Sequence, residues 1–379
     1  MRGVVRRVGL LSFLAAALLA PALAQAGSGM YVGAASDWPK QSAFVDSKAQ
    51  FELAAAAGLN AIRITARWSP GMTEPTPDVI ALYDTTAQAA AFTGVRLIVS
   101  VYPAGNRQVP LNAVTRAQFV AFAAGLARSV PLIKDFIIGN EPNLNYFWLP
   151  QYDRKGRSVS AAAYVKLLAA TYDALKAVDP SIRVIGGSVS PRGTDRPFGK
   201  RPTHSPGMFI LAMGDAYRAL GRTAPIMDQF AFHPYGASSQ TPPWKRNSNS
   251  TTISLNDYDR LVAALGEAFD GTAQPGSALP IVYDEYGVQT KIPPEKAALY
   301  TNADSPSAAD AVDEATQAFY YRRALEIAAR QPTVVGFLFF HTVDEADLRR
   351  WQSGLFYPDF TPKTSLPAVL STVLALRGA

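Results

Sequence analysis

Short apolar runs alternate along this chain with longer segments of helical pattern. The runs contain many β-branched and aromatic residues and predict eight strands, at residues 30–35, 61–66, 95–101, 134–139, 182–187, 227–232, 280–284 and 334–340. The alanine- and leucine-bearing segments predict helices, among them 49–57, 115–128, 161–178, 257–268, 309–330 and 365–376. Strands that alternate with helices are typical of parallel βαβ units, and eight units predict an α/β fold of the (β/α)8 TIM barrel type.

The connecting segments support a barrel. Those before the strands are short, whereas those after them are long, as at residues 143–160, 188–206, 236–255 and 287–308. Barrel enzymes build their sites from the loops that follow the strands. An open doubly wound sheet is the alternative, but no G-x-G-x-x-G or phosphate-binding loop follows the first strand.

The first 26 residues have the pattern of a cleaved signal peptide. Arg2, Arg6 and Arg7 precede an apolar run, and Ala24-Gln25-Ala26 supplies small residues for cleavage before residue 27. An uncleaved membrane anchor is the alternative, although the run is short for a stable span. We expect a secreted protein, extracellular or periplasmic, whose single catalytic domain covers residues 27–379.

Composition narrows the class of protein further. Without the three signal-peptide arginines the formal charge falls from +6 to +3, because 33 basic residues then face 30 acidic ones. This small excess gives little support for nucleic-acid binding. The chain has no cysteine, so its stability outside the cell must come from the core rather than from disulfides. We expect a monomer that binds carbohydrate, with no nucleic acid and no stable membrane anchor.

Two predicted strands end on a glutamate. Glu141 follows the apolar run at 134–139, and Glu285 follows the run at 280–284. A glycoside hydrolase needs two such carboxylic acids, one to protonate the leaving oxygen and one to attack the anomeric carbon or activate a water. Without its strand context, Glu141 would be read as a surface glutamate in a turn.

Asp284 competes with Glu285 for the second position. Successive strand residues point to opposite faces, so regular alternation allows only one of the two to face the barrel mouth. We expect Glu285 to face the mouth, on the same side as Tyr283. Asp284 should then pair with a basic group between the barrel and the helices.

The run from Asn140 to Trp148 resembles a motif of known enzymes. It reads N-E-P-N-L-N-Y-F-W and is similar to the N-E-P-N-L-x-x-F-W run of glycoside hydrolase family 39, in the clan GH-A of retaining (β/α)8 enzymes. The stretches 354–356 and 361–363 are also similar to that group. The resemblance implies that Glu141 is the acid/base and Glu285 the nucleophile.

Five further residues match the clan pattern at strand ends. Arg63 resembles the arginine that supports the nucleophile, and a rim salt bridge is its alternative role. Asn140 resembles the residue that binds the sugar 2-hydroxyl. His233 and Tyr235 resemble the histidine and tyrosine around the nucleophile, although a histidine beside an apolar run is often only a core residue. His341, after the last strand, is a similar candidate.

Tryptophans near the predicted loops are candidates for sugar stacking. Trp38, Trp148, Trp244 and Trp351 all fall near these loops, and an indole can stack on a pyranose. Packing beneath loops is the alternative for about half of such residues. Trp148 is the strongest candidate because it lies in the family-like run, and we also assign Trp351 to substrate binding.

Three positions depart from the family pattern. Gly139 replaces the usual tryptophan before Asn-Glu, Asp284 replaces a small residue before the nucleophile, and the 339–341 segment Phe-Phe-His lacks a common tryptophan. These changes leave the sugar and the linkage open. The accessory β-domain of family 39 xylosidases should also be absent, since a barrel with long loops uses the whole chain.

Other functions have less support in the sequence. The three histidines, at 204, 233 and 341, form no H-x-H or H-E-x-x-H motif for a metal. No G-x-S-x-G pentapeptide suggests an esterase. A carbohydrate-binding pseudoenzyme needs neither glutamate. We therefore expect a retaining glycosidase that needs no cofactor, since its two carboxylates provide the chemistry.

Overall fold

The computed structural model describes residues 29–304 and 309–378. The predicted signal peptide and its cleavage site lie outside these residues. Eight parallel strands form a closed barrel in sequence order, and β8 pairs with β1. The strands are β1 (Tyr31–Ala35), β2 (Ala61–Trp68), β3 (Arg96–Pro103), β4 (Asp135–Ile138), β5 (Arg183–Val189), β6 (Gln229–Phe232), β7 (Ile281–Tyr286) and β8 (Val334–Phe340). The predicted (β/α)8 barrel is therefore confirmed.

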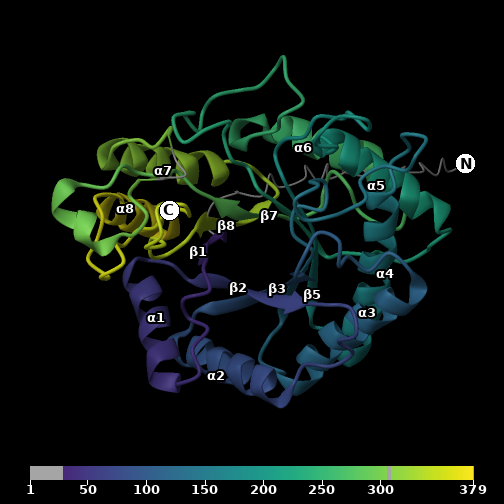
Figure 1. Cartoon of the computed structure of the whole chain (residues 1–379), viewed down its shortest axis with the longest axis horizontal. Coiled ribbons are helices and arrows are strands. Elements are labelled where there is room, and N and C mark those ends of the chain that lie inside the picture. The colour runs from purple at the N-terminus through teal and green to yellow at the C-terminus, as the bar shows by residue number, and fades with distance from the viewer. Residues whose placement is uncertain (1–28, 305–308, 379) are drawn as a thin grey trace, which may run out of the picture.

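A ring of helices surrounds the barrel (Figure 1). Its members are α1 (Phe44–Ala56), α2 (Pro77–Thr93), α3 (Ala113–Ser129), α4 (Ser160–Val178), α5 (Pro206–Ala219), α6 (Tyr258–Phe269), α7 (Glu314–Ala328) and α8 (Ser365–Gly378), with short 3-10 helices at Leu255–Asp257 and Pro294–Leu299. Capping residues in the local sequence set where some of these helices begin and end. Thr76 caps α2 through its hydroxyl, and Gly94 ends that helix with φ 69°.

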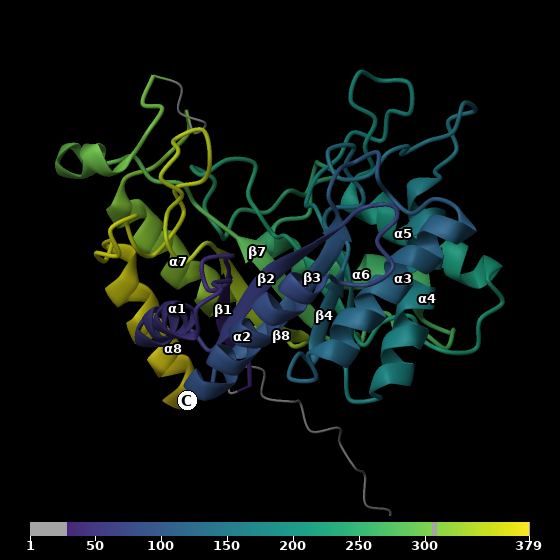
Figure 2. The same cartoon turned by 60° about the horizontal axis from the view of Figure 1, so that its bottom comes forward.

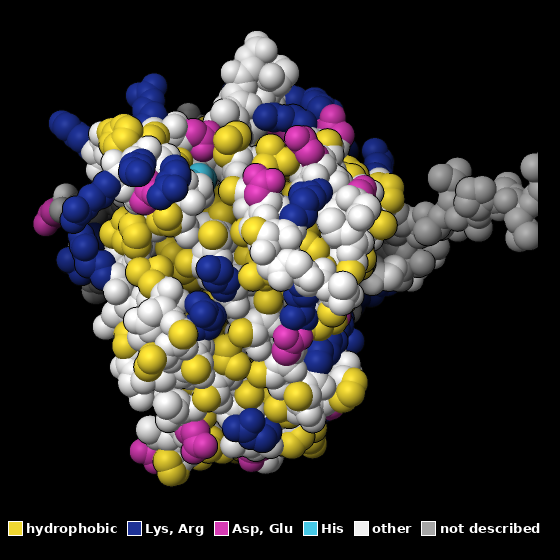
Figure 3. Space-filling model, turned by 90° about the vertical axis from the view of Figure 1, so that its right-hand side faces the viewer, with side chains coloured by type: hydrophobic (Ala, Val, Ile, Leu, Met, Phe, Trp, Pro, Cys, Tyr) yellow, Lys and Arg dark blue, Asp and Glu magenta, His cyan; other side chains and the backbone are white. Residues whose placement is uncertain are grey.

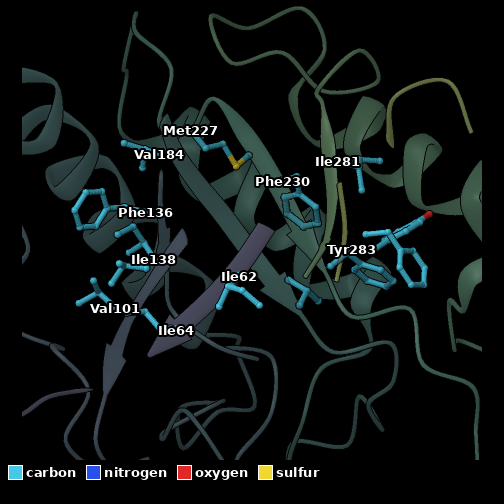
Figure 4. Packing of buried hydrophobic residues seen from close by; sticks show 14 of the residues in the cluster. Ile62, Ile64, Val101, Phe136, Ile138, Val184, Met227, Phe230, Ile281 and Tyr283 are labelled. Carbon is cyan, nitrogen blue, oxygen red and sulfur yellow. The ribbon is translucent and has the colours of Figure 1, made fainter. Parts of the chain in front are cut away.

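The apolar core has two layers. One lies between the strands and the helices, and Figure 4 shows Ile62, Phe136 and Phe230 within it. The other fills the barrel, with alternate strand residues such as Ile98 and Val282. Each buried parallel strand contributes to both layers, which is why it reads as a nearly continuous apolar run.

A charged cluster fills the amino-terminal end of the barrel. Asp135 accepts hydrogen bonds from Arg96 and Arg183, and the Arg96 guanidinium lies 4.5 Å from the centre of the Tyr31 ring. All four residues begin their strands. This network closes one end of the barrel and leaves the other for a site.

Long loops extend from the carboxyl-terminal end of the strands, as Figure 2 shows in side view. The stretch 238–252 is a loop, as expected, with no helix or strand. On the face in Figure 3, Lys and Arg side chains lie among acidic and apolar ones. None of the described helices is both long enough and apolar enough to cross a membrane.

Candidate active site

Glu141 and Glu285 line one cleft at the carboxyl-terminal end of the barrel. The cleft has a volume of about 590 Å³. His233, directly after β6, joins the two glutamates. Its Nδ1 lies 2.9 Å from Glu141 Oε1 and 3.5 Å from Glu285 Oε2. The fold therefore brings together two carboxylates that are 144 positions apart in the chain.

The backbone around Glu141 turns sharply out of β4. Gly139 has φ 93° and Glu141 has φ 41°, and the Glu141 N–H donates to Ser188 O at 2.8 Å. A Cβ atom at position 139 would lie 2.9 Å from Tyr164 Cε2. Tyr164 is itself held in place, because its hydroxyl donates to Ile138 O. A tryptophan therefore has no room at position 139, which accounts for this departure from the family pattern.

The expectation for Asp284 is wrong. Tyr283 pairs with Phe337 and Tyr286 with Phe339, so β7 contains one more residue than β8 over this stretch. Such a bulge breaks the regular alternation of side chains. Val282 faces the barrel interior and Tyr283 the outer layer, so regular alternation places Asp284 inside the barrel. The bulge then turns Glu285 into the cleft as well. Asp284 does pair with basic groups, Arg63 and His233, but inside the barrel rather than beneath the helices.

Arg63 links the nucleophile candidate to the neighbouring residues. Its Nη1 donates to Glu285 Oε1 at 2.6 Å and lies 3.4 Å from Asp284 Oδ2. Its Nη2 donates to Asn140 Oδ1 at 2.7 Å. Burial alone would lower the pKa of Arg63, but the Asp284 and Glu285 carboxylates outweigh burial and raise it. Arg63 is therefore a buried partner of the site and not a rim salt bridge.

His233 carries a proton on both ring nitrogens. Ser188 Oγ donates to Asp284 Oδ2 at 2.8 Å, so its oxygen accepts from His233 Nε2, 3.0 Å away. Nδ1 donates to Oε1 of the Glu141 carboxyl group. Burial lowers the pKa of His233, but the Glu285 and Asp284 carboxylates more than offset this and raise it to about 10. An imidazolium therefore lies between the Asp284 and Glu285 carboxylates, where its charge reduces their mutual repulsion, and it donates to the Glu141 carboxyl group.

Tyr235 and Asn140 complete the immediate surroundings of the two glutamates. The Tyr235 hydroxyl donates to Glu285 Oε2 at 3.1 Å, so each Glu285 oxygen receives a hydrogen bond. Burial and the Glu285 charge raise the pKa of Tyr235 well above its usual value, which keeps the hydroxyl protonated. Asn140 accepts from Arg63 through its oxygen and lines the cleft. Its amide nitrogen is left as the group that can donate to a ligand.

His341 and Trp351 also line the cleft. His341 follows β8 with φ 78°, and its Nε2 lies 3.4 Å from Glu345 Oε2. Trp351 packs edge-on against Phe340, with ring centres 5.2 Å apart, and its ring centre lies 5.5 Å from that of Tyr235. Trp351 thus forms an aromatic wall beside the nucleophile candidate.

Trp148 does not reach the cleft, so its assignment to sugar stacking is wrong. Its side chain is only 1% exposed and meets Tyr164 edge-on in the core. The turn after Glu141 instead presents the two preceding aromatics, Tyr146 and Phe147, to the cleft. Trp38 and Trp244 also lie away from the cleft and pack against phenylalanines.

Several residues of the site were not anticipated from the sequence. Ser188 lies in a bulge of β5, between Gly187 and Val189, and has φ 48°. The Gly-Gly pair at 186–187 was an available signal, because glycine within a strand often marks a bulge. Arg67, Tyr102 and Arg192 line the cleft as well, but nothing in their local sequence marks them.

The described residues contain no group of three or more His, Asp or Glu side chains arranged to hold a metal ion. Deep in the cleft, the charged groups around the two glutamates are instead paired with one another across the barrel, as Arg63 with Glu285 and His233 with Glu141. The arrangement offers two carboxylic groups with fixed hydrogen-bond partners, which suits acid/base and nucleophilic chemistry.

Comparison with known proteins gave structural matches only. No family model and no curated protein matches the sequence. A family 39 glycoside hydrolase from Bacteroides cellulosilyticus WH2 matches with a TM-score of 0.62 and 19% identity, over 91% of this chain and 64% of that one. The chain shares its fold with family 39 glycoside hydrolases. It spans about two thirds of the length of that enzyme.

Two other structures give similar results. A monomeric β-xylosidase from Caulobacter crescentus CB15 has a TM-score of 0.55 and 19% identity, over 91% of this chain and 69% of that one. A family 5 enzyme, of subfamily 18, from Streptomyces cattleya in complex with GlcNAc has a TM-score of 0.61 and 16% identity, over 93% of this chain and 81% of that one. These neighbours agree with the resemblance seen in the Asn140–Trp148 run. At such identities the likeness establishes the fold.

Proposed function

We propose that this protein is a retaining glycosidase that hydrolyses O-glycosidic bonds of a polysaccharide or oligosaccharide. The observation that carries the proposal is the shared contact of Glu141 and Glu285 with His233 Nδ1. The two oxygens can be no further apart than the sum of these contacts. Two carboxyl groups that share one hydrogen-bond donor face each other across the cleft, which supports the closer spacing of about 5–5.5 Å in retaining enzymes.

The roles of the two glutamates follow from their partners. Glu285 receives hydrogen bonds from Arg63 and Tyr235, one on each oxygen. A cation and a hydroxyl that donate to a carboxylate favour its ionised form and hold its orientation, as a nucleophile requires. Glu141 lies on the turn after β4 and is the remaining carboxylic group in contact with His233 and the cleft.

In the first step, Glu285 attacks the anomeric carbon while Glu141 protonates the leaving oxygen. In the second step, Glu141 takes a proton from water, and the water oxygen displaces Glu285 from the sugar. Asn140 donates to the 2-hydroxyl, and Trp351 and His341 form a wall of the sugar site. A carbohydrate-binding protein without catalysis would need neither carboxylate. Secretion, with a mature chain that begins near Gly27, remains part of this proposal.

Exchange of either glutamate tests the assignment. We expect Glu285→Ala to abolish turnover of every substrate, because no glycosyl-enzyme bond can form. Glu141→Ala should retain more activity on aryl glycosides whose leaving groups need no protonation. The rates would be measured on a panel of aryl glycosides, and the anomeric proton would be followed by NMR with a substrate that is turned over.

The first product should keep the starting anomeric configuration. Glu267→Ala, which removes an exposed glutamate from the outer helix α6, is the matched control and should leave the rates unchanged. An inverted first product would overturn the retaining mechanism. Full activity in either cleft variant would overturn the assignment of that glutamate.

A further inference from the structure

Two arginines on the cleft walls have no carboxylate partner among the described residues. Arg67 lies near the end of β2, and Arg192 follows β5. Both side chains are exposed and both line the cleft with Glu141 and Glu285. In contrast, Arg63 in the same cleft is buried and paired with Glu285. The two exposed arginines therefore have a charge that the catalytic groups do not balance.

Both guanidinium groups are held in position. The Arg67 guanidinium lies over the Tyr102 ring, 4.1 Å from its centre. Arg192 Nη1 donates to Ala237 O at 2.9 Å. Stacking uses the flat face of the Arg67 guanidinium and leaves its N–H edge free to donate. A single carbonyl bond likewise leaves Arg192 with unused donors. These contacts reduce the entropy that each side chain would lose on binding a ligand.

The other acids of the cleft wall already have partners. Asp37 accepts from the Thr65 N–H at 2.7 Å and lies 3.2 Å from Lys40 Nζ. Glu345 lies 3.4 Å from His341 Nε2 and accepts from the Trp351 N–H. Neither acid forms an ion pair with Arg67 or Arg192. An anionic ligand would therefore meet two arginines that no wall carboxylate neutralises.

We propose that the cleft binds an acidic saccharide, whose carboxylate or sulfate groups are bound by Arg67 and Arg192. A planar guanidinium donates two parallel hydrogen bonds to such groups. Neutral sugar hydroxyls need no positive charge. The two arginines come from different walls, at β2 and β5, so each binds a separate acidic group. This inference names the substrate class of the proposed glycosidase and rests on that function only for the claim that the ligand is hydrolysed.

The first test is direct binding. Purified Glu285→Gln protein, which should not consume its ligand, would be applied to an array of neutral, carboxylated and sulfated glycans. We expect the retained glycans to carry carboxylate or sulfate, and their binding to weaken as salt rises from about 0.05 to 0.5 M because the arginines are exposed. The carboxylated and sulfated arms of the array show which anion is bound. Retention of neutral glycans alone, or of none, overturns the proposal.

The second test assigns the binding to these arginines. Arg67→Gln and Arg192→Gln, each in the Glu285→Gln protein, should raise the dissociation constant for the retained acidic glycan about three- to tenfold. In the double variant the dissociation constant should rise by about the product of the two factors, because the two arginines bind separate groups. Arg128→Gln removes an exposed arginine from the last turn of α3 and should change nothing. Equal affinity in the double variant and the control would refute the assignment.

The two proposals fail in different ways. Hydrolysis of neutral aryl glycosides, without binding of acidic glycans, would remove this inference and leave the glycosidase in place. Salt-sensitive binding of acidic glycans that are never hydrolysed by the unsubstituted protein would support this inference and contradict the glycosidase function. Unfolding curves of each variant show whether a loss of binding comes from a loss of fold.

Discussion

Asp284 places a third carboxylate beside the two glutamates of the site. It is fully buried, with Arg63 and His233 within 3.4 Å and the Ser188 hydroxyl donating to it. Burial raises the pKa of Asp284, but His233 and Arg63 outweigh burial and lower it. A buried charge is tolerated only when it is paired and hydrogen-bonded in this way. Asp284 departs from the family pattern, and the charges of Arg63 and His233 and the Ser188 hydroxyl stabilise its buried carboxylate.

Two tryptophans that both fall near predicted loops should respond differently to truncation. Trp148→Ala should destabilise the protein by about 3–5 kcal/mol, because its buried ring would leave a cavity. Trp351→Ala should mainly weaken glycoside binding, since its ring lines the cleft. Unfolding free energies and KM values of both variants would be compared. Equal effects of the two substitutions on stability, or an unchanged KM for Trp351→Ala, would contradict this division of roles.

Irregularities in two strands build the polar part of the site. In β5 an extra residue, Ser188, lies between the positions that pair with Ala231 and Phe232. In β7 the extra residue lies between Tyr283 and Tyr286. The bulge in β5 turns Ser188 inward to meet Asp284, and the bulge in β7 turns Glu285 into the cleft beside them. Regular alternation from the inward residues Ile185 and Val282 would have placed Ser188 and Glu285 among the apolar residues beneath the helices.

The hydrogen bonds of the Ser188 hydroxyl should affect stability and turnover more than the strain of its backbone does. Ser188→Ala removes the partner of both Asp284 Oδ2 and His233 Nε2 and leaves φ 48° on a residue with a Cβ. Ser188→Gly removes the same hydroxyl but tolerates that φ. We expect both variants to lose about 1–3 kcal/mol of unfolding free energy and to turn over glycosides more slowly. A fully active, stable Ser188→Gly protein would show that strain dominates.

At the scale of the molecule, the two ends of the barrel differ in structure and in proposed function. The amino-terminal end is closed by Asp135 with Arg96 and Arg183. The carboxyl-terminal end has the long loops and the cleft (Figure 2). Catalytic groups on such a barrel are held by the strands, while the loops supply contacts with substrate. Variation in Arg67, Arg192 or Trp351 can therefore change what binds without disturbing Glu141 and Glu285.

The charge of His233 should make global stability depend on pH. Its pKa rises from 6.5 to about 10 in the folded protein, where Glu141, Asp284 and Glu285 surround it. The folded state therefore holds this proton more tightly than the unfolded state. The resulting stabilisation is fully present below pH 6.5 and is lost as pH rises toward about 10.

The difference in unfolding free energy between the unsubstituted protein and a His233→Asn variant isolates this effect. Chemical denaturation at several pH values from 6 to about 10 would measure it. We expect the advantage of the unsubstituted protein to shrink across that range. A difference that stays constant with pH would show that His233 is not charged in the folded protein.

Pattern alone predicted most of the architecture. The eight strands lie within a few residues of their predicted positions, and β8 matches 334–340 at both ends. Buried parallel strands are apolar on both sides, so their sequence signal is strong and local. The two glutamates at strand ends were also visible in the sequence, because a strand end is set by nearby residues such as Gly139 and Pro142.

The tertiary structure alone decided which side chains meet. The bulge in β7 turned Glu285 into the cleft beside Asp284, which already faces the barrel interior, and packing on Tyr164 buried Trp148 although its sequence run resembled a sugar-binding loop. Strand pairing and core packing join residues that are far apart in the chain, whereas periodicity reports only local geometry. The sequence by itself determined the barrel and the two glutamates, and the register and packing of the folded chain determined their partners.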